Sequence, residues 1–312
     1  MTGNARPTAF VTGAAGFIGT ELVKVLVAAG YQVFGLARSV ESTRHLQRAG
    51  AIAIRGDLLV PGRWQDEAAA DWVFHIPPCA RTRARSWPGA ERIASIRALM
   101  DTHLLDAVAG GATRRIVYVA DSRCYGPTEP RPVTEDEVSV STARGRCLIP
   151  ALGRLDGYVI AGLPVVTALP GCVYGNASWF RERVIDPVMA GRRVLQFGKA
   201  GPWVSPIHVH DCARALVHLA ERGDVGSRYF LTNNEPIRMH EFAETFARVA
   251  NRPLRVWRVP AATAGLLVGP PMADYVHGNL ALSNIRLRGT GFRFRYPTLE
   301  QGIEQLLGTP HE

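Results

Sequence analysis

The 312-residue sequence predicts an α/β protein with a doubly wound parallel sheet and a small C-terminal lobe, and three observations lead to this fold class. A short apolar run at 9–11 passes through a glycine turn into an amphipathic segment, Phe17 to Ala29. The same alternation of short apolar runs and helical segments continues through the first half of the chain. A hydrophobic content of 47% with 20% charged residues is ordinary for such a protein, and the chain is long enough to bury a large core.

The glycine turn is the strongest local signal, and residues 7–20 read PTAFVTGAAGFIGT. Gly13 permits a tight turn, Gly16 lets the backbone approach a pyrophosphate, and Gly19 lets the following helix pack closely on its strand. The N–H groups at the start of that helix then face the anion. This strand–turn–helix context predicts a dinucleotide-binding Rossmann domain, with a purely structural glycine turn as the alternative. The residues of this turn expected to contact the cofactor are Gly13, Ala15, Gly16, Phe17, Ile18 and Gly19.

The second predicted strand, 32–36, leads into Arg38 and Ser39. In this fold the end of the second strand meets the adenosine ribose, where an acidic residue selects NAD and an arginine accommodates the 2′-phosphate of NADP. Arg38 with Ser39 supplies a cation and a hydroxyl, so the sequence favours NADP(H). The alternative is an exposed arginine at a helix start.

The next elements extend the same pattern. Helices are predicted at 41–49, 89–108 and 142–161, with a kink or interruption at Pro150. Strands are predicted at 51–54, 71–76, 115–120 and 163–169. Ligands of parallel sheets bind at the carboxyl ends of the strands, and the residues expected to contact the cofactor there are Asp57, Leu58, Ile76, Pro77, Pro170 and Val173.

Beyond the sixth strand the pattern loosens. Helices are predicted at 179–190, 207–219, 239–250 and 298–307. We expect residues 1–172 and 205–232 to form the Rossmann domain, and 173–204 with 233–312 to form the small lobe, which binds the substrate.

Composition excludes several function classes. No apolar run approaches the ~20 residues of a membrane span, and the N-terminus enters a strand without a signal peptide. The five cysteines have no ligand spacing, which indicates reduced thiols and no metal site. We therefore expect a cytoplasmic protein with no membrane partner. The net charge of +9 is carried by scattered arginines without a recognition motif, so we expect a small-molecule substrate and no nucleic acid.

Several segments together resemble the extended short-chain dehydrogenase/reductase family, which contains NAD(P)-dependent epimerases, dehydratases and reductases. The resemblance implies a nicotinamide cofactor and the doubly wound fold, and relatives often form homodimers through the two long helices, here near 89–108 and 142–161. The segments that carry it are TGAAGFIG at 12–19, ARS at 37–39, GDL at 56–58, RIVYVADSRCYG at 115–126, LPGCVYG at 169–175 and SPIHVHDCARAL at 205–216.

The chain departs from the family at the catalytic positions. Members usually carry Ser or Thr four residues before the Tyr-Gly of the fifth-strand loop, where this chain has Asp121 followed by Ser122. Their Tyr-x-x-x-Lys pair aligns with Thr142 and Arg146. The only lysines are Lys24 and Lys199, and 133–157 contains no tyrosine, so no realignment restores the pair.

These substitutions leave a changed chemistry. Asp121 is a candidate acid/base, or alternatively a carboxylate paired with Arg123 or Arg146. Ser122 either donates to a substrate carbonyl or caps the loop. Arg146 can hold the nicotinamide ribose but cannot shuttle a proton, because arginine stays charged. Thr142 can hydrogen-bond a substrate oxygen or a relay water.

Other polar residues have structural alternatives. Tyr125 and Tyr174 are either acids or structural side chains, and His208 and His210 most simply cap and pack a helix start. The arginines after the fourth strand either meet an acidic substrate or belong to an exposed loop; they are Arg81, Arg83 and Arg85. The cysteines near the strand ends are interpreted as small apolar filler; they are Cys79, Cys124, Cys147 and Cys172.

The sequence therefore favours an atypical NADP-dependent reductase of a small carbonyl or an enone- or quinone-like metabolite. One alternative is an isomerase, cyclase or dehydratase that uses Asp121 and retains NADP as a scaffold. Another is a non-catalytic NADP-binding sensor or interaction protein. The arginine- and alanine-rich composition is associated with bacterial secondary metabolism.

Overall fold

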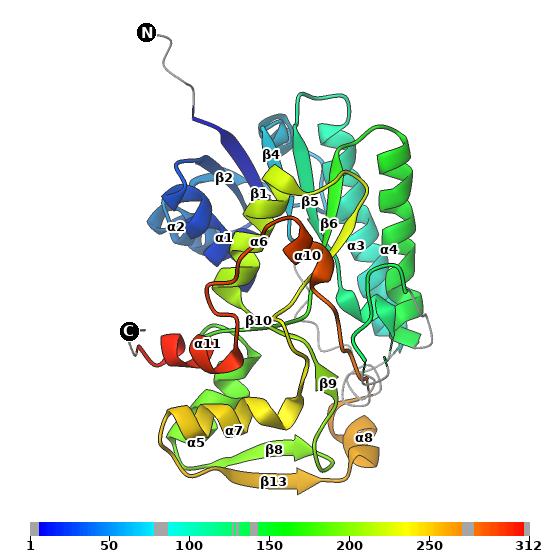
Figure 1. The fold of residues 1–312 in the computed structure, drawn as a ribbon. Coiled ribbons are helices and arrows are strands. Elements are labelled where there is room, and N and C mark those ends of the chain that lie inside the picture. The colour runs from blue at the N-terminus through cyan, green and yellow to red at the C-terminus, as the bar shows by residue number, and fades with distance from the viewer. Residues whose placement is uncertain are drawn as a thin grey trace.

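The centre of the protein is a seven-stranded parallel sheet (Figure 1). The computed structural model describes residues 6–77, 87–126, 128, 131–137, 143–269 and 278–308. Neighbouring strands run parallel throughout, with Val11 opposite Gly35 on one side and Phe74 on the other. In sheet order the strands are β11 (Arg228–Leu231), β6 (Val165–Pro170), β5 (Arg115–Val119), β4 (Trp72–His75), β1 (Thr8–Thr12), β2 (Gln32–Ala37) and β3 (Ile52–Arg55).

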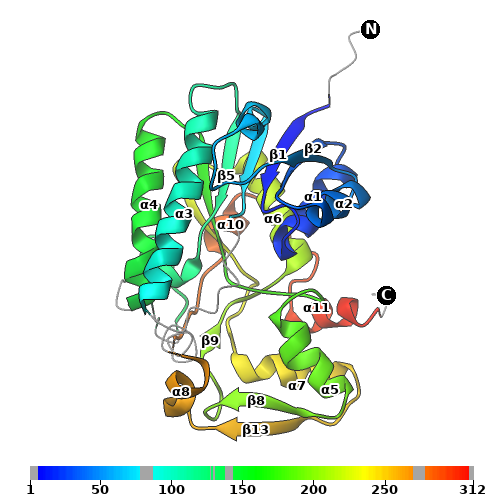
Figure 2. The ribbon, with the colours of Figure 1, turned by 180° about the vertical axis from the view of Figure 1, so that it is seen from behind.

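Helices cover both faces of this sheet, so the predicted doubly wound fold is confirmed (Figures 1 and 2). One face carries α1 (Phe17–Ala28), α2 (Val40–Arg48) and α6 (Val209–Arg222), which share one apolar core. The other carries η1 (Arg63–Ala68), α3 (Trp87–Val108) and α4 (Ala143–Ile160), which share a second. Among the described residues, no helix combines the length and apolar character that crossing a membrane requires.

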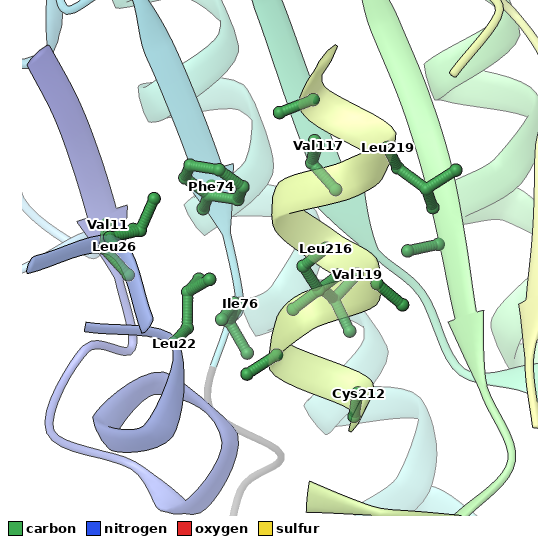
Figure 3. Packing of buried hydrophobic residues seen from close by; sticks show 14 of the residues in the cluster. Val11, Leu22, Leu26, Phe74, Ile76, Val117, Val119, Cys212, Leu216 and Leu219 are labelled. Carbon is green, nitrogen blue, oxygen red and sulfur yellow. The ribbon is translucent and has the colours of Figure 1, made fainter. Parts of the chain in front are cut away.

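The core under α1 and α6 explains why the glycine turn is held firmly. Leu22 of α1 and Leu216 of α6 point toward the sheet, where Val11, Phe74 and Val117 meet them (Figure 3). All five side chains are at most 1% exposed. Burying each of them contributes about 1.5–3 kcal/mol, so the start of α1 has a fixed position relative to the carboxyl ends of β1 and β4.

A smaller lobe lies beyond the carboxyl ends of the strands (Figure 1). Its core is aromatic, with Tyr174, Phe180 and Phe242 in edge-on and tilted contacts. Three short strand pairs frame it: β7 (Cys172–Tyr174) with β10 (Pro206–His208), β9 (Trp203–Val204) with β12 (Ile237–Arg238), and β8 (Arg193–Phe197) with β13 (Arg255–Val259). Its helical segments are η3 (Arg181–Ile185), α5 (Asp186–Met189), α7 (Met239–Val249), η4 (Ala261–Thr263), α8 (Ala264–Val268) and α11 (Leu299–Leu306).

The chain returns to the sheet before its last helix. The short helix α10 (Ile285–Gly289) packs against β11 and buries Leu287 in the core beneath α6. Asp211, fully buried in the first turn of α6, accepts backbone hydrogen bonds from Arg295 (2.8 Å) and Tyr296 (2.7 Å). Part of the segment 233–312 therefore lies beside the sheet, and the expected division into two domains stays a prediction.

Two local expectations, for Pro150 and for His208, can be compared with the structure. The helix α4 runs without interruption through the exposed Pro150, so an interruption there is wrong, while the alternative of a kink stays a prediction. Pro150 removes one N–H bond and stands on the solvent side, where the lost bond costs least. His208 is the N-cap of α6, and its Nδ1 accepts a hydrogen bond from the backbone of His210 at 3.2 Å. The capping interpretation of His208 is confirmed.

The burial of His208 generates a prediction about pH. Burial lowers the pKa of His208 from 6.5 to about 4, so between these values the unfolded chain binds a proton that the folded chain does not. The free energy of unfolding should therefore decrease as the pH is lowered from about 6.5 to about 4, by about 1.4 kcal/mol per pH unit from this group. We expect His208→Asn, which keeps an acceptor at the N-cap, to flatten the slope in urea unfolding curves recorded at several pH values.

Wild type and variant are compared by the slope of the unfolding free energy against pH, because lost packing lowers the stability of the variant equally at each pH. His45→Asn, at an exposed position of α2, should keep the wild-type slope. Equal slopes in wild type and His208→Asn would contradict the assignment.

Candidate cofactor and active site

The glycine turn has the geometry that its sequence predicts. Gly13 has a φ of +65°, and a Cβ there would lie 1.9 Å from the carbonyl oxygen of Ile76. A Cβ at Gly19 would lie 2.1 Å from the carbonyl oxygen of Gly13. Both positions therefore require glycine, one for the turn and one for helix packing.

Gly16 begins α1 as its N-cap, with extended backbone and no side-chain cap in the described chain. Phe17 and Ile18 open the first turn, and Ala15 lies in the turn before it. The first N–H groups of a helix have no partners within the helix and carry the positive end of its dipole. With no acidic side chain in the first turn of α1, this end suits a pyrophosphate.

The end of β2 lies beside the turn, because β1 and β2 are paired in parallel. Arg38 follows the last residue of β2 and is exposed. The Ser39 oxygen accepts a hydrogen bond from the backbone N–H of Ser42 at 3.1 Å and caps α2. The Arg38 side chain is therefore exposed at this edge of the sheet, whereas the Ser39 hydroxyl already serves as the cap of α2.

The other expected cofactor residues reach the same edge. Asp57 follows β3, and one of its carboxylate oxygens accepts a hydrogen bond from the backbone of Leu59 at 3.0 Å. Leu58 is buried, and its carbonyl accepts a hydrogen bond from His103. Ile76 and Pro77 follow β4 and are buried.

The loop after β5 is tied to the end of β6. The Ser122 hydroxyl donates to the carbonyl of Pro170 at 2.7 Å and is buried, which matches the loop-capping interpretation. Val173 lies on β7, opposite Ile207 of β10, in the crossing from the sheet to the lobe.

Asp121 is the N-cap of the short helix η2 (Ser122–Tyr125). Arg123 binds its carboxylate with two hydrogen bonds, from Nε at 2.8 Å and from a terminal nitrogen at 2.5 Å. This is the geometry of the paired carboxylate, one of the two alternatives that the sequence left open, with Arg123 as the partner.

The aligned Thr142 lies outside the described residues, and so do Cys79 and the arginines at 81, 83 and 85. Arg146 is exposed near the start of α4. The structure therefore describes only one member of the substituted pair, and the roles of both remain predictions.

The two tyrosines considered as acids are held in structural settings. The Tyr125 hydroxyl donates to the carbonyl of Glu135 at 2.9 Å, and burial raises its pKa to about 12. Tyr174 is fully buried in the aromatic core of the lobe, and burial raises its pKa far above the ordinary value. Burial likewise raises the pKa of Cys124 to about 12, which agrees with its interpretation as filler.

A buried polar network below this edge is the feature that sequence reasoning missed. The Asp101 carboxylate on α3 accepts hydrogen bonds from His75 of β4 (2.9 Å) and from Tyr118 of β5 (2.7 Å). Thr12 of β1 lies 2.7 Å from the other ring nitrogen of His75. Arg97 contacts both Asp101 (3.1 Å) and Tyr118 (3.0 Å) through Nε and donates to the carbonyl of Val119.

The charges of this network do not cancel. Burial lowers the pKa of His75, so its ring is neutral, with one nitrogen donating and the other accepting. Burial alone would raise the pKa of Asp101, but the hydrogen bond from His75 and the charge of Arg97 hold it below the ordinary value. Arg154 of α4 also lies 3.4 Å from this carboxylate. Two cations thus share one anion, and Arg97 places positive charge at the carboxyl end of β5.

The fold is of the Rossmann type, and comparison with known proteins supports an enzyme with a nicotinamide cofactor. Residues 9–147 match the model of the NAD dependent epimerase/dehydratase family. This match supports, over the N-terminal part of the chain, the resemblance that the motifs indicate.

Two relatives are reductases. A 4-hydroxy-2-methyl-3-oxo-4-farnesyl-3,4-dihydroquinoline-1-oxide ketoreductase of Stigmatella aurantiaca is 27% identical, covering 82% of this chain and 77% of the relative. A dTDP-4-dehydro-6-deoxy-D-allose reductase of a Streptomyces species is 26% identical, covering 83% and 86%. The structure of a UDP-glucose 4-epimerase of Thermus thermophilus in complex with NAD superimposes with a TM-score of 0.77, at 21% identity over 97% of this chain and 98% of that one, and this likeness shows the fold. The protein is an oxidoreductase-type enzyme.

The network generates a stability prediction. Asp101→Asn removes the only negative charge among these described side chains and leaves Arg97 partly buried without a counter-charge. Removing one partner of a buried ion pair costs about 3–5 kcal/mol, and we expect a loss near the lower limit, because Arg97 keeps some exposure (22%). Urea unfolding measures it.

Asp106→Asn is the matched control, because this aspartate is exposed on the same helix and also accepts a hydrogen bond from a tyrosine, Tyr158. It should cost less than about 1 kcal/mol. Equal losses in both variants would contradict a special role for Asp101.

Proposed function

We propose that the protein is an NADP-dependent reductase of a small carbonyl compound or an enone- or quinone-like metabolite, working without the Tyr–Lys pair of its family. The observation that carries the cofactor choice is the exposed Arg38 at the end of β2, next to the glycine turn. A cation at this position pairs with a 2′-phosphate, whereas NAD-binding relatives of this fold use an acidic residue there.

The described residues fit such a cofactor. Gly13 and Gly19 bring the turn and the helix together, and the uncapped start of α1 offers N–H groups for the pyrophosphate. Ile76 and Pro77 are apolar, buried residues at the end of β4. Bound NADPH supplies a hydride to the substrate.

The two reductase relatives support the direction of the chemistry. One acts on a ketone of a farnesylated quinoline oxide and the other on a dehydro sugar nucleotide, as their names state. Both reactions reduce a carbonyl group, although the two substrates have little else in common. We therefore infer carbonyl reduction as the reaction class.

Arg97 compensates in part for the missing lysine. Its guanidinium is fixed by Asp101, Tyr118 and Val119 at the carboxyl end of β5. A fixed cation at this edge stabilises the negative charge that develops on a substrate oxygen when hydride adds. Arginine cannot release a proton, so in this proposal the proton comes from water or from a hydroxyl such as that of Thr142.

Calorimetric titration tests the cofactor assignment. We expect NADPH to bind in the micromolar range and more tightly than NADH. Arg38→Asp should weaken NADPH binding about 10- to 100-fold, since a charge-assisted hydrogen bond contributes about 1.5–3 kcal/mol, and should shift preference toward NADH. Arg48→Asp, at the exposed end of α2, is the control and should change little. If wild type binds neither dinucleotide, the reductase proposal is wrong.

Turnover separates the reductase from its alternatives. NADPH oxidation is followed with a panel of aldehydes, ketones, enones and quinones, and we expect one NADPH consumed per carbonyl reduced. Asp121→Asn should retain activity within about threefold, because its carboxylate serves Arg123, whereas loss of a positioned acid costs about 10²–10⁴-fold.

Two other results would favour the alternatives. Product formation without net NADPH consumption, abolished by Asp121→Asn, would favour the isomerase or dehydratase. NADPH binding without turnover of any compound would favour the sensor.

A further inference from the structure

The strands β8 and β13 form a two-stranded parallel sheet at the end of the small lobe farthest from the seven-stranded sheet (Figures 1 and 2). Its inner face packs on η3 and α5, and Val194 of this face is buried in the aromatic core. The outer face has no covering element among the described residues. Side chains alternate along a strand, so the residues at 193 and 195 share the outer face with their partners at 255 and 257.

The outer face combines cations with large apolar side chains. Arg193 is paired in register with Arg255, and Leu195 with Trp257. Leu195 is 41% exposed and Trp257 58%. The helix α8, which follows β13 through η4, adds two exposed leucines at one end of this small sheet (Figure 1). We call this set the basic apolar surface, and its members are Arg193, Leu195, Arg255, Trp257, Leu266 and Leu267.

The charge of this region is strongly one-sided. Residues 189–199 and 250–268 contain six lysines and arginines and no aspartate or glutamate. These 30 residues thus carry six of the nine net positive charges of the chain. The six are Arg192, Arg193, Lys199, Arg252, Arg255 and Arg258. The charge that looks scattered along the sequence is concentrated by the pairing of β8 with β13.

Against the expectation from the sequence that the protein has no membrane partner, we propose that the basic apolar surface docks the protein on an anionic lipid bilayer as a peripheral membrane protein. Arginines attract anionic headgroups, while an interfacial tryptophan and leucines enter the boundary between headgroups and acyl chains. Leu266 is 90% exposed in the free protein, and docking on a bilayer would remove its apolar side chain from water. The two features are needed together, because one anchoring signal alone gives only marginal membrane binding.

Charge and chemistry favour this occupant over two others. A nucleic acid would use the arginines, but exposed leucines contribute nothing to phosphate contacts or base stacking. A second copy of the chain would bring six positive charges against six, which repel each other. A bilayer with anionic lipid satisfies both the charge and the apolar side chains.

Flotation with vesicles tests the proposal on the full chain. Wild type should float with vesicles of phosphatidylcholine containing about 30% phosphatidylglycerol, weakly with phosphatidylcholine alone, and less at high salt. Arg193→Glu with Arg255→Glu should lower the partition coefficient by more than about tenfold, since each change replaces an attraction by a repulsion. Leu266→Gln with Leu267→Gln should lower it by at least about threefold at unchanged charge.

The matched control is Arg48→Glu with Arg288→Glu, which changes the net charge equally at exposed positions beside the main sheet and should leave flotation nearly unchanged. Circular dichroism establishes that each variant folds. Three results would overturn the proposal: no flotation of folded wild type, an equal loss in the control, or a leucine variant that floats as well as wild type. The surface would be reassigned to a nucleic acid or to a second copy of the chain under one condition. Arg193→Glu with Arg255→Glu would have to abolish tight oligonucleotide binding or self-association and leave flotation unchanged.

Discussion

The carboxylate of Asp101 joins more of this protein than any other single group described. It accepts hydrogen bonds from strands β4 and β5 and from helix α3, approaches Arg154 on α4, and reaches β1 through His75 and Thr12. In an apolar interior such a charge is tolerated only when every lone pair has a partner. The relative positions of three strands and two helices are therefore fixed by one set of hydrogen bonds, immediately below the edge where the cofactor is expected.

Much of the fold follows from the sequence, because local chemistry and overall topology agree in the first half of the chain. The run from β1 to α1 is predicted by its apolar residues and by glycines that sterics require at 13 and 19. Later strands such as β11 and β13 escaped prediction. Strand β11 is only four residues long, and β13 reads as RVWRV, in which two arginines interrupt the apolar residues.

The site was less accessible to sequence reasoning than the fold. The role of Asp121, as an acid/base or as a paired carboxylate, depends on whether the Arg123 side chain binds its carboxylate. The spacing of the two residues in the sequence does not decide this. The network around Asp101 was missed because its members come from separate elements, with Thr12 and His75 on two strands and Tyr118 on a third. Two local signs were present. Arg97 and Asp101 are four residues apart on a helix face, and His75 and Tyr118 are polar residues in mainly apolar strands. Paired on neighbouring strands, these side chains meet at one height in the sheet.

The glycine turn has a consequence for how such motifs are interpreted across related chains. The backbone contacts at Gly13 and Gly19 are internal to the protein, between the turn, the helix and the end of β4. A descendant that abandoned its cofactor would still need both glycines in order to fold. Gly16 differs, because a Cβ there would meet only the oxygen of Gly13 at 3.0 Å, a contact that a small shift relieves. Of the three glycines, Gly16 is therefore the one that folding constrains least. In a lineage that no longer binds a dinucleotide, we expect Gly16 to be replaced while Gly13 and Gly19 are kept.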